Sequence, residues 1–346
     1  MDRRSRIFPA LFLALATLLA PAAAEAQQRT RLVIYTASEV DQLSALKAAI
    51  EADHPDVEVV WVRDSTGVIT ARLIAERDTP RADMIFGIVT SSLLLLERMN
   101  VLEPYTPKGV DQLKPQFRDP NDPYSWTGLD AFVVAVCFNT NEARRLSIAR
   151  PERWQDLAGP QFQNRIVMPH PASSGTGFLL VSNWIQVMGE DAAWQFMEKL
   201  HRNVALYTHS GSAPCVQAAR GERLVGLSFD MRGAREKALG APVDVIIPEE
   251  GVGWEMGGMA IVRGRPAAQT DAARRISDWA IGPKANELFA RFYGIVARQG
   301  FGSPPHYPRE AESRMTPSNS EWMAENRDRV LAEWTRRFDN PSTNRN

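Results

Sequence analysis

Hydroxyl side chains gather in five short turns of this 346-residue sequence. Each turn follows a run of strand-forming residues and precedes a helical pattern, where serine and threonine commonly cap helices. Capping alone explains any one turn. Helix N-termini carry about half a positive charge, so converging turns could together hold a phosphate-like oxyanion without lysine or arginine. The residues are Ser38, Ser65 and Thr66, Thr90 and Ser91, Ser173, Ser174 and Thr176, and Ser210 and Ser212.

Two segments carry carboxylates that could face a cation. Asp230 directly follows the apolar run 224–229, and Trp254 and Glu255 lie in the glycine-rich stretch 253–258. A carboxylate pairs with an ammonium group, and an indole ring face attracts cations. Asp230 is equally compatible with a helix cap, and Trp254 with a packing anchor, so both interpretations stay open.

The motifs of common enzyme classes are absent from the sequence. No Gly-x-Ser-x-Gly elbow occurs, and the five histidines are scattered. The segment 64–67 reads Asp-Ser-Thr-Gly as in aspartic proteases, but it lacks a second copy. No His-x-x-x-His or Cys-x-x-Cys metal spacing and no nucleotide-binding glycine fingerprint is found. We therefore predict a binding protein, not an enzyme, with no catalytic residues, metal site or cofactor. An exported hydrolase remains the alternative.

Strands alternate with helices along the chain, which predicts an α/β fold with parallel-type sheets flanked by helices. The first series begins with the strand 32–35 and the helix 40–52, and the second begins with the strand 165–168. Strands at 243–247 and 258–262 are expected to return towards the first series. We thus predict a discontinuous first lobe, 27–130 with 248–346, and a second lobe, 131–247.

The first 26 residues have the pattern of a secretory signal peptide. Three arginines precede the apolar run 7–20, and Ala24-Glu25-Ala26 matches a signal-peptidase site. We expect cleavage before Gln27, a periplasmic location and no membrane insertion of the mature chain. The net charge of −1 gives no support for nucleic-acid binding. An oxidising compartment permits a disulfide between Cys137 and Cys215, but the sequence leaves that pairing open.

The order of several motifs resembles the periplasmic binding proteins of the ferric-iron and 2-aminoethylphosphonate group, and most closely the 2-aminoethylphosphonate-binding members. These motifs are Tyr-Thr-Ala-Ser-Glu at 35–39, Arg-Ala-Asp-Met-Ile-Phe at 81–86, Ser-Ser-Gly-Thr-Gly-Phe at 173–178 and Gly-Gly-Met-Ala-Ile-Val at 257–262. The resemblance implies the type II fold, in which two lobes joined by crossover strands close on a ligand, and an ABC importer permease as partner. Iron-binding relatives carry paired tyrosines where this sequence has Asp230 and Met231, which argues against ferric iron.

The resemblance and the turns together predict a ligand site for 2-aminoethylphosphonate. We expect the phosphonate among Ser38, Thr66, Ser173, Ser174 and Thr176. The ammonium would face Asp230, Glu255 and Glu39, with Trp254 against the carbon chain. Another phosphate-like anion, a polyamine or ferric iron are the alternatives as ligand.

Overall fold

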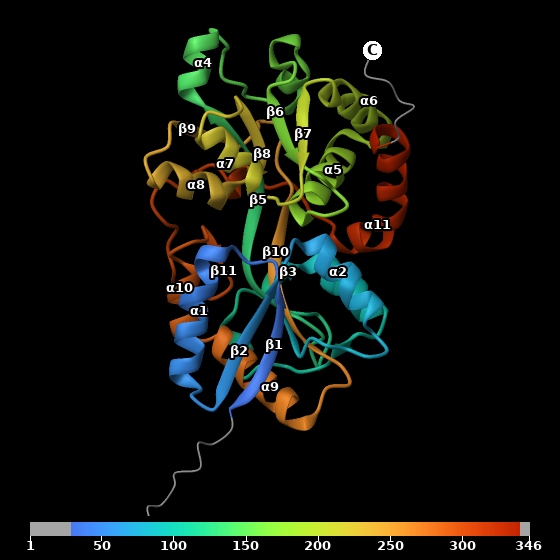
Figure 1. Cartoon of the computed structure of the whole chain (residues 1–346), viewed down its shortest axis with the longest axis vertical. Helices are drawn as coiled ribbons and strands as arrows, with labels where there is room; N and C mark the ends of the chain where they lie inside the picture. The colour runs from blue at the N-terminus through green and yellow to red at the C-terminus, as the bar shows by residue number, and fades with distance from the viewer. Residues whose placement is uncertain (1–28, 340–346) are drawn as a thin grey trace, which may run out of the picture.

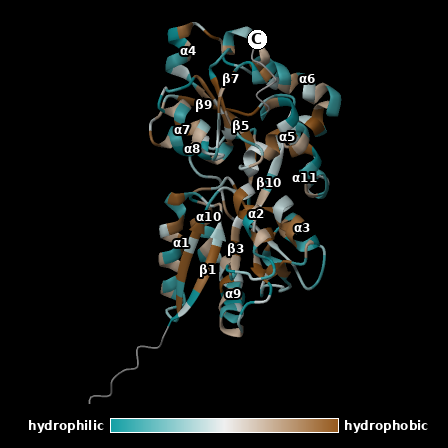
Figure 2. Ribbon diagram, turned by 45° about the vertical axis from the view of Figure 1, so that its right-hand side comes forward, coloured by the Kyte–Doolittle hydropathy of each residue, from teal (hydrophilic) through white to brown (hydrophobic). Residues whose placement is uncertain are grey.

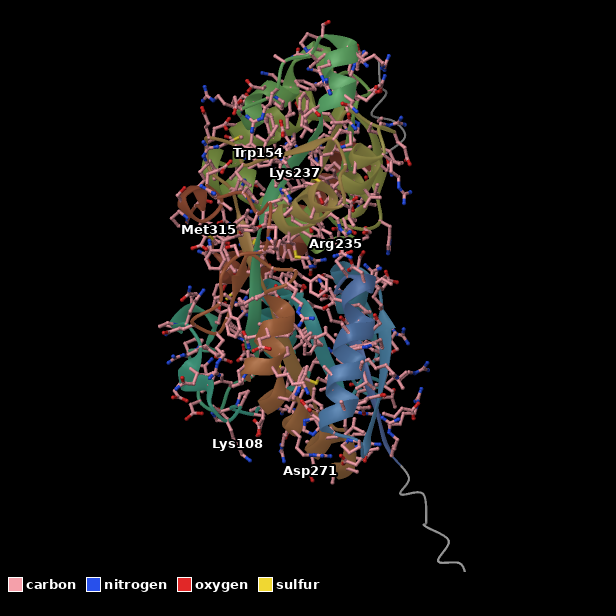
Figure 3. All side chains as sticks on the ribbon, turned by 90° about the vertical axis from the view of Figure 1, so that its left-hand side faces the viewer. Lys108, Trp154, Arg235, Lys237, Asp271 and Met315 are labelled. Atoms are coloured by element: carbon pink, nitrogen blue, oxygen red, sulfur yellow. A yellow bond between two sulfur atoms is a disulfide. The ribbon has the colours of Figure 1, made fainter. Side chains whose placement is uncertain are left out.

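Two α/β lobes joined at a waist make up residues 29–339, which the computed structural model describes (Figure 1). The predicted signal peptide and its cleavage site lie outside these residues. Figure 3 places Lys108 and Asp271 at the far end of the first lobe, and Trp154 and Lys237 in the second. In the described part of the chain, one curled sheet of eleven strands runs through both lobes.

The first lobe is built on parallel strands rich in β-branched residues. Leu32 and Ile34 of the first strand are fully buried, and Leu32 pairs in register with Val59. Such apolar strands need a helical layer on both faces. The strands of this lobe are β1 (Thr30–Thr36), β2 (Val57–Arg63), β3 (Met84–Val89), β4 (Leu102–Glu103), β10 (Trp254–Val262) and β11 (Ile295–Val296). Its helices are α1 (Val40–Asp53), α2 (Thr66–Ala75), α3 (Thr90–Arg98), α9 (Ala267–Ala280) and α10 (Pro283–Phe289).

The second lobe repeats the same strand and helix alternation. Its strands β6 and β8 are parallel, as are β6 and β7. The strands are β6 (Ile166–Pro169), β7 (Val204–Thr208), β8 (Val225–Phe229) and β9 (Val243–Ile246). The helices are α4 (Thr140–Leu146), α5 (Gly175–Met188), α6 (Glu190–His201), α7 (Ala213–Ala219) and α8 (Asp230–Ala238).

The long strand β5 (Thr127–Asn139) crosses the waist. Its first half pairs with β10 and β11 of the first lobe, and its second half, from Val134, pairs with β8 and β9. The antiparallel strand β10 pairs its first residue, Trp254, with Val133 of β5. Because β5 belongs to the sheets of both lobes and β10 pairs with it only as far as Val133, a relative movement of the lobes must bend β5 near Val133.

Each lobe has its own hydrophobic core, which follows from the apolar inner faces of its strands and helices (Figure 2). Phe86 and Phe289 pack together in the first core, and Trp154 and Trp184 make an edge-to-face pair in the second. Aromatic pairs of this geometry add stability beyond the apolar area that they bury. The two cores make each lobe a rigid support for the residues at the waist.

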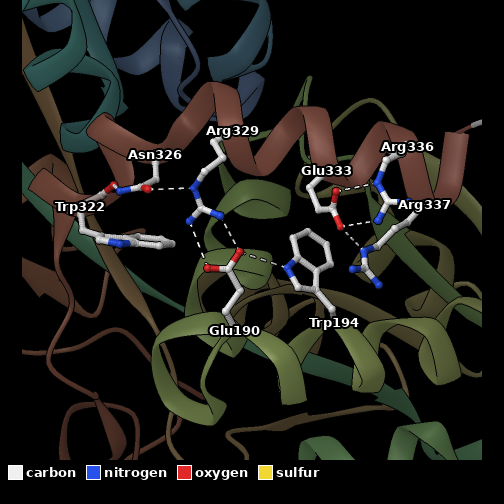
Figure 4. Close-up of polar contacts among 8 residues, drawn as sticks. All are labelled: Glu190, Trp194, Trp322, Asn326, Arg329, Glu333, Arg336 and Arg337. Atoms are coloured by element: carbon white, nitrogen blue, oxygen red, sulfur yellow. Dashed lines mark hydrogen bonds and ion pairs between the residues drawn. The ribbon is translucent and has the colours of Figure 1, made fainter.

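The C-terminal helix, which the predicted domain division assigned with all of 248–346 to the first lobe, also packs on the second lobe. In helix α11 (Ser320–Trp334), Met323, Val330 and Trp334 are buried in the second core. Arg329 pairs with Glu190 of α6 at 2.5 Å (Figure 4). The same helix also contacts the first lobe, because Ala324 belongs to the first core and Arg98 of α3 pairs with Glu321, so α11 spans both lobes.

The two cysteines form a disulfide that joins β5 to α7. Both residues are fully buried and lie with Ala218 in a small apolar cluster. The pairing that the sequence left open is therefore made. No helix within residues 29–339 is long and apolar enough to cross a membrane.

Candidate functional site

A small cavity of about 80 Å³ lies at the waist, between the two lobes. Residues from β2, β3, β5, β8 and β10 line it, together with the segment 37–39 before α1 and the starts of α2, α5 and α8. Its volume is far below the roughly 300–1,000 Å³ of sites for drug-sized ligands. In this closed arrangement the cavity therefore suits a ligand of only a few heavy atoms.

Six of the hydroxyl residues predicted from the turns line this cavity, and four of them are residues that we expected to hold the phosphonate. Ser38 precedes α1, Thr66 begins α2, and Ser174 and Thr176 lie at the start of α5. All four residues are at most 6% exposed. Within the described residues, none of their hydroxyl groups donates a hydrogen bond, although Ser174 Oγ accepts one from the Gly177 N–H. The hydroxyl hydrogens are thus available to a ligand.

The starts of α2 and α5 add the positive ends of two helix dipoles to these hydroxyls. The first N–H groups of a helix have no partner within the helix and carry its positive dipole end. Gly175, which opens α5, also lines the cavity, and a methyl group there would lie 3.1 Å from the Thr66 side chain. The two helix starts therefore lie against each other across the lobes, which favours an anion between them.

Gly87 and Gly211 allow the hydroxyl side chains to take these positions. Gly87 has a φ of +69°, and a Cβ built on it would lie 2.1 Å from Ser38 Oγ. A Cβ on Gly211 would lie 2.4 Å from Thr176 Oγ1. A larger residue at either position would displace a hydroxyl group from the cavity wall.

Two oppositely charged residues complete the polar wall. Arg63, the last residue of β2, lines the cavity and donates from Nε to the Ser38 carbonyl at 3.1 Å. Its guanidinium adds a full positive charge to a wall that we expected to lack one. Glu39 also lines the cavity, but its carboxylate pairs with Arg232 of α8 at 2.5 Å.

Asp130 of β5 is a buried carboxylate in the cavity wall. It lies beside Gly257, where an added Cβ would be 2.8 Å from Asp130 Oδ1. No lysine, arginine or histidine of residues 29–339 pairs with it. Burial and the nearby Asp230 raise the pKa of Asp130 well above its usual range. A cation in the cavity would supply the missing partner and restore the ionised form.

The rest of the cavity wall is largely apolar and aromatic. Phe132 and Phe229 make an edge-to-face contact with ring centroids 5.6 Å apart, and Met231 lies beside them in the lining. Tyr293 also lines the cavity, and its hydroxyl donates to Gln42 Oε1 at 2.8 Å. The cavity thus combines anion donors and a carboxylate with surface for a short carbon chain.

Ser173 and Asp230, which we predicted as ligand residues, do not line the cavity. The Ser173 hydroxyl donates to the His209 carbonyl at 3.0 Å. Asp230 accepts from the Tyr307 hydroxyl at 2.7 Å and from the Met231 N–H at 2.7 Å. Burial raises the pKa of Asp230 to about 7. Its two oxygens have protein partners, and it lies behind the cavity near Asp130.

Trp254 and Glu255 likewise lie outside the cavity lining, at the start of β10. Trp254 Nε1 donates to the Thr316 carbonyl at 3.1 Å. The Glu255 carboxylate accepts from the hydroxyls of Ser91 and Ser320, and burial raises its pKa to about 7. The Glu255 hydrogen bonds attach β10 to α3 and α11. Trp254 and Glu255 therefore stabilise the waist and do not form part of the cavity wall.

Two charged cavity residues, Arg63 and Asp130, were not predicted from the sequence although a signal was present. Arg63 directly follows the largely apolar run 57–62, and Asp130 directly precedes the apolar run 131–138. A single charged residue beside an apolar strand therefore deserved to be considered as a site residue. No group of three or more potential metal ligands occurs among the described side chains.

Two α/β lobes, a long strand that runs through both of them and a polar cavity at the waist are typical of the type II class of periplasmic binding proteins. Residues 80–319 match the family of bacterial extracellular solute-binding proteins, and the chain belongs to that family. An uncharacterized protein of Haemophilus influenzae is 31% identical over 76% of each chain. A probable ABC transporter periplasmic-binding protein, y4fP of Sinorhizobium fredii, is 24% identical over 69% of this chain and 66% of its own.

Solved structures of binding proteins share the whole architecture. AfuA of Actinobacillus pleuropneumoniae, with exogenous fructose-6-phosphate bound, is 27% identical with a TM-score of 0.84, over 90% of this chain and 99% of that one. The periplasmic binding protein P5PA is 25% identical with a TM-score of 0.83, over 90% and 100%. Iron-bound HitA of Pseudomonas aeruginosa, at 16% identity and a TM-score of 0.74 over 88% and 99%, shows the fold alone.

Proposed function

We propose that this chain captures 2-aminoethylphosphonate in the periplasm and delivers it to the permease of an ABC importer without altering it. The observation that carries the proposal is Asp130, a buried carboxylate without a cationic partner in the same cavity as a set of anion donors. A zwitterion with an anionic head, a short carbon chain and an ammonium group would satisfy both features.

The anionic group of the ligand matches the hydroxyl-rich part of the wall. The side chains of Ser38, Thr66, Ser174 and Thr176 can donate to phosphonate oxygens, and Arg63 adds charge. Charge-assisted hydrogen bonds of this kind are about twice as strong as neutral ones. The phosphorylated sugar in AfuA supports the choice of a phosphorus oxyanion, since that protein is similar over nearly its whole length.

The cationic group of the ligand matches Asp130. An ammonium brought beside this carboxylate neutralises a charge that burial otherwise disfavours. Phe132 and Phe229 lie in the same wall, where they can cover the carbon chain. Asp130 thus takes the role that we first expected for Asp230 and Glu255, whose oxygens already have protein partners.

A phosphorylated sugar is the second candidate ligand, because fructose-6-phosphate is bound in AfuA. In that case Asp130 would accept hydrogen bonds from sugar hydroxyls. The small cavity volume favours the smaller ligand, but opening of the lobes would enlarge the site.

A thermal-shift screen followed by calorimetry tests the proposal. The panel contains 2-aminoethylphosphonate, ethylphosphonate, phosphate, fructose-6-phosphate, spermidine and a ferric salt. A ligand at 100 times its dissociation constant adds about 2.7 kcal/mol of stability, which is readily detected. We expect the largest shift with 2-aminoethylphosphonate, and its recovery unchanged after incubation. A larger shift with fructose-6-phosphate would favour the second candidate, and chemical conversion of the ligand would contradict a binding role.

A further inference from the structure

Arg232 of the second lobe forms an ion pair with Glu39, a residue of the first lobe that lines the cavity. Glu39 lies immediately before α1, and its Oε2 is 2.5 Å from Arg232 Nη2. The side chains are only 14% and 11% exposed. The pair joins the two lobes directly at the edge of the candidate ligand site.

The Arg232 side chain is held towards the cleft by its own helix. Its Nη1 donates to Glu236 Oε1 at 3.2 Å, one turn further along α8. Its Nε is buried and has no hydrogen-bond partner within residues 29–339. The guanidinium of Arg232 is therefore positioned by α8, but Glu236 accepts only one of its hydrogen bonds there. The carboxylate of Glu39, in the first lobe, is its main counter-charge.

A second ion pair continues the same contact away from the cavity. Asp41 of α1 pairs with Arg235 of α8, and these side chains are more exposed, at 29% and 36%. Figure 3 shows Arg235 at the edge of the second lobe that faces α1. Because exposed ion pairs contribute little, this pair serves as the matched control for the buried one.

Contacts on the other side of the waist show that the lobes are closed. His209 Nε2 lies 2.6 Å from Asp64 Oδ1, and the Gly67 N–H donates to the Ser173 carbonyl at 2.9 Å. Helices α1 and α8 lie on one side of the crossing strands, and α2 and α5 on the other (Figure 1). The buried pair of Glu39 and Arg232 is thus one of several contacts that exist only while the lobes meet.

The position of Glu39 gives this pair a consequence for the ligand. Glu39 lines the same cavity as Ser38 and Thr66, where an uncompensated carboxylate would repel an anion. Its compensating charge belongs to the other lobe, so the repulsion is removed only on closure. When the lobes close, α8 brings Arg232 to Glu39, and the cavity wall can then hold an anion without repulsion from that carboxylate.

We propose that Arg232 is a positioning residue that latches the closed lobes through Glu39 and thereby couples closure to anion binding. The inference rests on the proposed function for the choice of ligand, but the latch itself joins two protein side chains and can therefore be tested without ligand. A ligand binds more weakly when its competent state is less populated, in proportion to that fraction. Loss of the latch should therefore open the free protein and weaken binding together.

The test compares Arg232→Met, Glu39→Gln, the double variant and the control Arg235→Met. Small-angle X-ray scattering measures the radius of gyration without ligand, and calorimetry measures the affinity for 2-aminoethylphosphonate. We expect Arg232→Met to enlarge the free protein and to weaken binding at least about tenfold, since truncating one member of a buried charge pair is costly. Arg235→Met should change the affinity by no more than about threefold.

The variant with both Arg232→Met and Glu39→Gln shows whether Arg232 acts as a latch through Glu39 or only supports the fold. Adding Glu39→Gln should recover part of the affinity lost in Arg232→Met, because the carboxylate left without a partner is then gone. Additive losses, or a radius of gyration unchanged by Arg232→Met, would overturn the proposal. If Arg232→Met does not fold, Arg232→Lys and Glu39→Gln provide the same comparison. If the unmodified protein fails to bind 2-aminoethylphosphonate, the proposed function fails, while the scattering result still decides on the latch.

Discussion

Replacing Asp130 by Asn tests the assignment of the cation site with a minimal change of shape. The substitution keeps the size of the side chain and removes its ability to carry a negative charge. In the unmodified protein the ligand ammonium pairs with a carboxylate that is 4% exposed and has no other cationic partner in the described chain. In the variant the ammonium enters the same apolar surroundings without a counter-charge.

The expected loss follows from the burial of the pair. Truncating one partner of a buried, hydrogen-bonded charge pair costs about 2–5 kcal/mol, and each 1.4 kcal/mol is a factor of ten in affinity. The dissociation constant for 2-aminoethylphosphonate should therefore rise at least about thirtyfold. Ethylphosphonate has no amine, and Asp130 can stay protonated beside it because its pKa is raised. Asn resembles that protonated carboxyl, so the affinity for ethylphosphonate should change little.

Calorimetric titration of both proteins with both ligands measures this selectivity. Asp230→Asn is the matched control, since that carboxylate lies behind the cavity and is held by Tyr307. Equal losses for the two ligands in Asp130→Asn would contradict the assignment of Asp130 as the cation site, because the side chain would then act on the fold and not on the amine. A selective loss in Asp230→Asn instead would move the cation site to the residue first predicted from the sequence.

Three further predictions concern protons, the disulfide and the waist. Because burial raises the pKa of Asp130 and an ammonium favours its ionised form, amine binding should release protons; buffers of different ionisation enthalpy measure this release, and Asp130→Asn should reduce it. Reducing the bond between Cys137 and Cys215, 78 residues apart, should lower the free energy of unfolding by about 4–5 kcal/mol in the chain-entropy account, as measured by urea titration; an unchanged midpoint would contradict it. The pKa of Glu255 is raised to about 7, so its contribution to stability is present below pH 4.5 and is lost as pH rises through 7. Glu255→Gln should remove about 3 kcal/mol of that pH dependence in melting experiments, and an unaltered profile would show that another group is responsible.

Much of the fold follows from the sequence because strand and helix patterns are local. The apolar run at 32–35 and the amphipathic stretch after it reappear as β1 and α1, and the α/β class follows from their repetition. The packing of the C-terminal helix on both lobes could not be predicted, for the opposite reason. Its apolar stripe identifies a helix, but the lobe that covers Val330 and Trp334 depends on packing that no local pattern specifies.

Some residues of the candidate site could likewise be predicted from the sequence, and others could not. Ser38, Thr66, Ser174 and Thr176 could be predicted, because a turn after a parallel strand must lie at the ligand edge of a sheet. The carboxylates could not be ranked from sequence, since Asp130 and Asp230 both lie beside apolar strands. Only the three-dimensional structure shows which of them faces the cavity and which bonds to Tyr307.

A crystal structure of the protein with 2-aminoethylphosphonate would show directly whether Asp130 binds the ligand amine. We expect closed lobes and a ligand nitrogen within about 3 Å of an Asp130 oxygen. The phosphonate oxygens should lie within hydrogen-bonding distance of the hydroxyls of Ser38, Thr66, Ser174 and Thr176. A ligand nitrogen directed to solvent or to another carboxylate, or a phosphonate held away from the starts of α2 and α5, would contradict the proposed binding mode.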